Sequence, residues 1–126
     1  MPGKIADASV VAALAFQEPD AEKAASWLED GELYAPALLA YELVSVATKK
    51  IRRFPEKRGV LMQGLACALA MDFRWTEPDH ADVLAIALAT GLSAYDASYV
   101  SLARSLDAEL VSFDKALLAA AKKLAR

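Results

Sequence analysis

Short strand-like segments alternate with longer helical segments along the whole chain, and this alternation constrains the fold more than any other feature. The strand candidates are rich in apolar, aromatic or β-branched residues and cover residues 4–6, 33–35, 73–76 and 109–112. Two parallel strands in one sheet have to be joined by a crossover, which is usually a helix. We therefore predict an α/β fold in three layers, with a short central parallel sheet of about four strands flanked by helices.

Residues that start and stop helices mark the segments between these strands. Asp, Ser and Pro stand at the expected starts, and Gly follows two of the expected ends. Helices are predicted after Asp7, from Pro19 to Gly31, from Pro36 into a basic segment, over 59–71, from Pro78 to Gly91, from Ser93 to Leu106 and from Asp114 onward.

The length of 126 residues suits one domain with one core, and we predict a single domain over residues 1–126. No uninterrupted apolar run approaches the roughly 20 residues that a bilayer span needs, so no membrane segment is predicted. The first residues lack the charged region, long apolar region and cleavage site of a secretory signal. The cytoplasm is therefore the expected compartment.

The only cysteine and the only histidine exclude a zinc site built from these residue types. Cys67 lies in an apolar stretch and is expected to be a small core residue. His80 stands alone near a predicted helix start. A metal ion bound by this chain would therefore need oxygen ligands.

The formal net charge of -3 gives no general attraction to nucleic acid, but the basic residues are unevenly distributed. The segment 49–58 holds six of the 14 basic residues and one acid. Such a cluster can hold phosphates, and it can equally be a solvated helix end whose cations complement the helix dipole. Both interpretations stay open, with RNA phosphate or a protein partner as the contact of Lys49, Lys50, Arg52 and Arg53.

Asp7 and Asp114 follow the first and the last predicted strand. Ligands of open parallel sheets bind beyond the carboxyl ends of the strands, so both side chains should enter one cleft. Each residue alone is also explained as a helix N-cap. The functional interpretation therefore depends on further acids.

Glu42 and Asp96 supply these further acids, because each lies on the apolar side of its predicted helix. Burying a carboxylate there is costly unless a partner compensates, and no Lys or Arg is evident on the same face. A metal ion or a protonated carboxyl remain as explanations. A shared divalent cation would satisfy all four acids together.

Carboxylates of this kind favour Mg²⁺, with Mn²⁺ as the alternative ion, and leave coordination positions for phosphate oxygens. One or two such ions can activate water for phosphodiester hydrolysis. The chain has no glycine-rich phosphate loop and no nucleophile elbow. Metal-dependent phosphodiester hydrolysis is therefore the predicted chemistry.

Four stretches, residues 5–11, 36–43, 91–100 and 110–114, resemble in order and spacing the PIN domains, and among them the toxin nucleases of VapBC toxin–antitoxin pairs. The resemblance implies a Mg²⁺-dependent ribonuclease, usually a homodimer, silenced by an antitoxin whose C-terminal segment enters or covers the cleft. It further implies that Asp7 and Asp96 ligate the metal directly and that Glu42 and Asp114 complete the acidic pocket.

The same resemblance implies that Ser9 and Ser112 support the acids by hydrogen bonds, with Ser112 where the family often has threonine. Many relatives have one more short strand after the last helix. The sequence ends at Arg126, so the sheet is expected to be one strand shorter. Two alternatives remain: a non-catalytic PIN-like interaction module, and a nuclease that acts on DNA.

Overall fold

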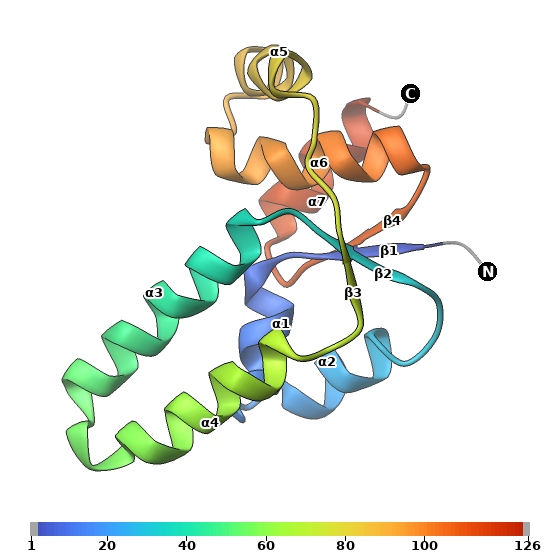
Figure 1. Cartoon of the computed structure of the whole chain (residues 1–126). Coiled ribbons are helices and arrows are strands. Elements are labelled where there is room, and N and C mark those ends of the chain that lie inside the picture. The colour runs from blue at the N-terminus through green and yellow to red at the C-terminus, as the bar shows by residue number, and fades with distance from the viewer. Residues whose placement is uncertain (1–2, 125–126) are drawn as a thin grey trace.

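The computed structural model describes residues 3–124 (Figure 1). Its elements alternate as the sequence predicts. In chain order they are β1 (Lys4–Ala6), α1 (Ala8–Ala15), α2 (Ala21–Trp27), β2 (Leu33–Ala35), α3 (Leu38–Arg53), the 3-10 helix η1 (Pro55–Lys57), α4 (Arg58–Leu69), β3 (Phe73–Trp75), α5 (His80–Thr90), α6 (Ala94–Leu106), β4 (Glu109–Val111) and α7 (Lys115–Leu124).

The four strands form one parallel sheet in the order β3-β2-β1-β4. The central strand β1 pairs with β2 on one side and with β4 on the other. All strands run in one direction, so their carboxyl ends share one edge of the sheet. The predicted α/β fold with a short parallel sheet between helices is confirmed.

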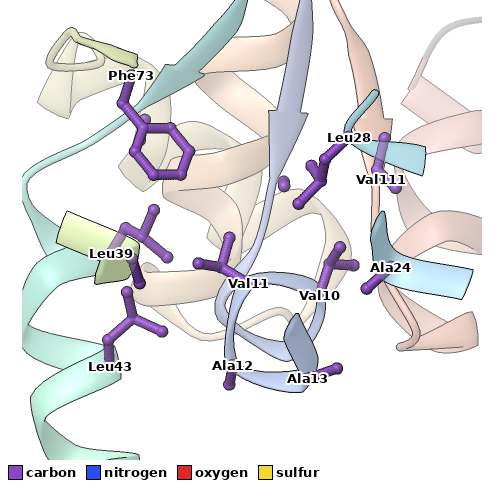
Figure 2. Close-up of a cluster of buried hydrophobic side chains, with 13 residues drawn as sticks. Val10, Val11, Ala12, Ala13, Ala24, Leu28, Leu39, Leu43, Phe73 and Val111 are labelled. Carbon is purple, nitrogen blue, oxygen red and sulfur yellow. The ribbon is translucent and has the colours of Figure 1, made fainter. Parts of the chain in front are cut away.

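One face of the sheet packs against helices α1 to α4 in the largest apolar cluster (Figure 2). Ala6, Ala35, Phe73 and Val111 point from the four strands into this cluster. Successive side chains of a strand point to opposite faces of the sheet, so the strand residues next to these four point toward the other helical layer. The helices contribute fully or nearly fully buried side chains, which include Val10, Val11, Ala24, Leu39, Leu43 and Ala68.

The opposite face is covered mainly by α6, with α5 and α7 packed beside it (Figure 1). Ile5 and Leu110 point to this side. Helix α6 buries Tyr99, Val100 and Leu102 against the strands and against its neighbouring helices. The sheet is therefore enclosed between two helical layers, and its carboxyl edge lies where α1, α3, α6 and α7 begin.

No single helix within residues 3–124 is long and apolar enough to cross a membrane. The one pair that reaches the length and composition together, α5 with α6, is bent by 114°.

Several element ends and one predicted core residue differ from the sequence predictions. Helix α2 ends at Trp27, and the left-handed Gly31 lies in the loop beyond it. Helix α3 begins two residues after Pro36. Cys67 is exposed, so its prediction as a core residue is wrong. Helix α4 is apolar on most sides, and its pattern therefore did not reveal which residues face solvent.

Candidate functional site

Asp7 is held in place by the helix that follows it and by the end of β4. Its Oδ1 accepts hydrogen bonds from the Ser9 hydroxyl at 2.6 Å and from the amides of Ser9 and Val10 at 3.1 and 3.4 Å. Its Oδ2 accepts from the Ser112 hydroxyl at 2.6 Å. Asp7 is thus the N-cap of α1 and, at 7% exposure, a buried carboxylate in a fixed orientation.

The turn after β4 is bonded to the same group. The Ser112 hydroxyl accepts from the Asp114 amide at 2.9 Å, and the Ser9 hydroxyl accepts from the Phe113 amide at 3.1 Å. Asp114 itself is exposed, and its Oδ1 accepts from the Ala116 and Leu117 amides at the start of α7. Its second carboxylate oxygen makes none of the hydrogen bonds found in the described chain.

Glu42 lies in the first turns of α3, partly buried, and is bonded across the site by α6. The Tyr99 hydroxyl donates to Glu42 Oε1 at 2.5 Å. Burial raises the pKa of Glu42, the hydrogen bond from Tyr99 opposes this, and the charges of Asp7 and Asp96 raise it further. Burial and the contact with Glu42 raise the pKa of Tyr99, which keeps its hydroxyl protonated as a donor.

Asp96 stands in the first turn of α6, where the Ser93 hydroxyl caps the helix by accepting from the Asp96 amide at 3.1 Å. Burial raises the pKa of Asp96, and the charges of Asp114 and Asp7 raise it further. All four predicted acids therefore take part in the two pKa shifts, as the shifted group or as a charge that shifts it. Asp7 and Asp114 are joined through Ser112, and the charges of Asp7 and Asp96 act on Glu42, so the four predicted acids lie near one another at the carboxyl edge of the sheet.

No cation of the described chain neutralises this region. The two ion pairs found within residues 3–124 join Lys50 to Glu18 and Arg74 to Glu32. As the described side chains are oriented, no three acidic, histidine or cysteine residues stand close enough together to share one metal ion. A shared ion would therefore require some of these side chains to rotate. Without such an ion, the neighbouring carboxylates repel one another.

The predicted basic residues lie far from the acids, at the other end of α3. Lys50 Nζ is 2.9 Å from Glu18 Oε2, in the loop after α1. The Arg53 guanidinium lies 5.4 Å from the centre of the Phe54 ring. Lys49, Arg52 and Arg53 are exposed. The structure does not bring these cations into contact with the carboxylates.

The family profile of the PIN domain matches residues 4–123. The chain belongs to the PIN-domain family. Ribonuclease VapC3 of Pyrobaculum aerophilum is 32% identical to it over an alignment that covers 90% of each chain. The crystal structure of PAE2754 from Pyrobaculum aerophilum superposes on it with a TM-score of 0.77 at 30% identity, over 94% of this chain and 79% of that one. The resemblance predicted from the four sequence stretches is confirmed.

Tyr99 is the residue of this PIN-domain site that the sequence interpretation missed. In the sequence, Tyr99 lies three positions after Asp96, on the apolar side of the same predicted helix. A buried tyrosine hydroxyl nearly always needs a hydrogen-bond partner. That requirement, applied next to a semi-buried acid, could have indicated that Tyr99 bonds a carboxylate of the site.

Proposed function

We propose that this protein is a Mg²⁺-dependent endoribonuclease and the toxin of a toxin–antitoxin pair. One observation carries the proposal: four carboxylates from separate segments lie near one another, and no basic side chain of residues 3–124 pairs with them. Accumulating negative charge in this way costs stability unless a ligand offsets it. Membership of the PIN family and the likeness to a protein named Ribonuclease VapC3 support the choice of RNA hydrolysis.

The donor set fits a hard divalent cation, because all of its members are carboxylates. Asp7 and Asp96 are the proposed direct ligands, and Glu42 and Asp114 complete the acidic pocket. Mg²⁺ is the proposed ion and Mn²⁺ the alternative. A bound divalent ion would supply a water of lowered pKa and positive charge beside the scissile phosphate.

The neighbouring hydroxyls fix the orientation of the carboxylates. Both oxygens of Asp7 are engaged, one by Ser9 and one by Ser112, so Asp7 has little rotational freedom. Glu42 is held through Oε1 by Tyr99. These hydrogen bonds reduce the entropy that would be lost when the carboxylates are ordered around substrate.

The proposed partners are an RNA substrate, a cognate antitoxin and a second copy of the chain, and the proposed compartment is the cytoplasm. Exposed large apolar residues support protein partners: Leu84 and Leu88, one turn apart on α5, are 61% and 78% exposed. Exposed apolar side chains that adjoin one another commonly mark protein interfaces.

Purified protein tests this function directly. We expect it to cleave single-stranded RNA in Mg²⁺, to stop when EDTA is added, and to lose cleavage in both Asp7→Asn and Asp96→Asn. Melting curves of the two variants serve as the control for folding. Cleavage that survives both substitutions contradicts the assignment, and cleavage of DNA alone changes the substrate. Absence of both nuclease activity and metal binding would indicate a non-catalytic interaction module.

A further inference from the structure

Helix α3 carries an acid of the site and two basic residues on one face. Side chains three, four, seven and eleven positions apart lie along the same side of an α-helix. Lys49 follows Glu42 by seven positions and Arg53 follows it by eleven. The polar Ser45 lies between them on this face, and Ser45, Lys49 and Arg53 are all exposed. Leu39, Leu43 and Ala47, which are buried, define the adjacent inward face.

The other two cations of this segment point elsewhere. Lys50 forms its ion pair with Glu18 on the side of α1. Arg52 lines an apolar groove of about 330 Å³ between α3 and α4, together with Arg58. The four basic residues thus spread over adjacent parts of the helix surface. Lys49 and Arg53 lie in line with Glu42. Lys50 and Arg52 lie to either side of that line, toward α1 and toward α4.

The turn into α4 places a further cation, Lys57, near the far end of this face. Phe54, which is 38% exposed, has the Arg53 guanidinium 5.4 Å and the Lys57 ammonium 5.0 Å from its ring centre. One aromatic ring thus holds two cations near each other. Like charges held together in this way attract an anion that can contact both.

The chemistry of this face fits a polyanion better than a protein. Its exposed members are a serine and two cations, in a chain with a formal net charge of -3. Two exposed apolar side chains of the hairpin, Val44 and Met62, lie on a different side, where they line the groove that Arg52 borders. A protein partner would bury that apolar side, whereas a phosphate backbone would follow the cationic one.

We propose that Lys49 and Arg53, with Lys57 at the tip, form a phosphate track along α3 that holds single-stranded RNA as it leads away from the carboxylates. The track rests on the ribonuclease function proposed above. Arg53 lies about 16 Å beyond Glu42 at 1.5 Å per helical residue. At roughly 3.4 Å of axial rise per nucleotide of a stacked strand, this distance spans about five nucleotides. In Figure 1, α3 and α4 project together from the sheet as a helical arm.

Oligonucleotide binding tests the track with two charge-matched double variants, Lys49→Glu/Arg53→Glu and Arg52→Glu/Arg58→Glu. All proteins carry Asp96→Asn to prevent turnover, and binding to labelled RNAs of 3 and 12 nucleotides is followed by fluorescence anisotropy over a series of salt concentrations. We expect the first pair to weaken binding of the longer RNA at least tenfold. The slope of log Kd against log salt should fall by about 1.4, since each lost phosphate contact removes about 0.7 for a single strand. The shorter RNA and the second pair should show neither change.

Equal losses in the two double variants would indicate a general electrostatic field and would overturn the track. An unchanged affinity and salt slope in Lys49→Glu/Arg53→Glu would overturn it as well, and weaker binding of a co-purifying protein by that variant would assign the face to a protein partner. Lys49→Gln/Arg53→Gln repeats the test if charge reversal prevents folding. Length-dependent binding without any RNA cleavage by the unmodified chain would refute the nuclease function and leave the track intact.

Discussion

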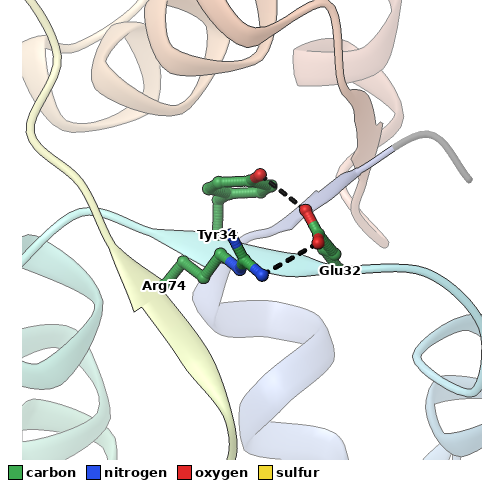
Figure 3. Close-up of polar contacts among 3 residues, drawn as sticks. All are labelled: Glu32, Tyr34 and Arg74. Atoms are coloured by element: carbon green, nitrogen blue, oxygen red, sulfur yellow. Dashed lines mark hydrogen bonds and ion pairs between the residues drawn. The ribbon is translucent and has the colours of Figure 1, made fainter.

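Two tyrosine–glutamate pairs in this molecule have nearly the same local geometry and opposite electrostatic surroundings. In the first, at the surface of β2, the Tyr34 hydroxyl donates to Glu32 Oε2 at 2.7 Å, and Arg74 of β3 pairs with Glu32 Oε1 at 2.9 Å (Figure 3). In the second, the buried Tyr99 donates to Glu42 at 2.5 Å, and the neighbouring charges are those of Asp7 and Asp96.

The difference lies in the source of the positive charge. Arg74 neutralises Glu32 within the fold, so the surface pair is complete and links two adjacent strands. Glu42 is surrounded by further acids, and burial adds to the cost of their charge. A complete cluster is explained by structure alone, whereas an uncompensated one indicates a ligand that supplies the charge. The first prediction tests this distinction by its effect on activity.

Asp96→Asn should lower RNA cleavage by about a hundredfold to a thousandfold, the order of loss seen when one group that stabilises the reacting charge is removed. The matched change Glu32→Gln should leave the rate unchanged, because Glu32 is already neutralised by Arg74. Single-turnover cleavage of a labelled RNA measures both. Comparable losses in the two variants would show that the contrast between the clusters has no functional meaning.

Divalent cations should stabilise the acidic site and leave the surface pair unaffected. At an ion concentration 100 times the Kd, binding to the native state adds about 2.7 kcal/mol to the free energy of unfolding. We therefore expect Mg²⁺ to raise the melting temperature of the unmodified chain and of Glu32→Gln. The gain should largely disappear in Asp7→Asn. Urea unfolding with and without Mg²⁺ measures this, and an equal gain in Asp7→Asn would place the ion elsewhere.

The parallel sheet and its acids could be predicted from sequence because they depend on local patterns. Four apolar segments separated by helix-start signals imply crossovers, and crossovers imply a shared carboxyl edge, which is where Asp7 and Asp114 lie. Helix ends were less predictable. Helix α2 ends at Trp27, four residues before Gly31, the glycine that the sequence suggests as its end.

Features that depend on which side of a helix meets another element could not be predicted from local sequence. Cys67 and Ala68 are neighbours in an apolar run, yet only Ala68 is buried against the core. Tyr99 contacts Glu42 across 57 positions, a pairing that no local spacing reveals. The pairing of Lys50 with Glu18 and the position of Arg52 beside the groove likewise emerge only with the packing of α1 and α4.

The two tyrosines themselves provide a test of smaller effects on stability. Tyr99→Phe removes the donor to a partly buried carboxylate and should cost about 1 to 2 kcal/mol of the free energy of unfolding. Tyr34→Phe should leave the melting temperature unchanged within error, because water and Arg74 still solvate Glu32. Thermal unfolding in EDTA compares them. A larger effect at Tyr34 would reverse the proposed ranking of the pairs.

The smallest expected effect is a pH dependence of stability that comes from Glu42. Its pKa is raised in the folded state, so between the unfolded pKa, near 4, and the folded pKa the native chain binds more protons than the unfolded chain. Stability therefore falls as pH rises through that window and levels off above it. In EDTA, Glu42→Gln should reduce this decrease, because the amide still accepts from Tyr99 and carries no charge. Glu32→Gln should preserve it. Urea unfolding between pH 4 and 7 distinguishes the two variants, and an unaltered decrease in Glu42→Gln would mean that the raised pKa of Glu42 is not its cause.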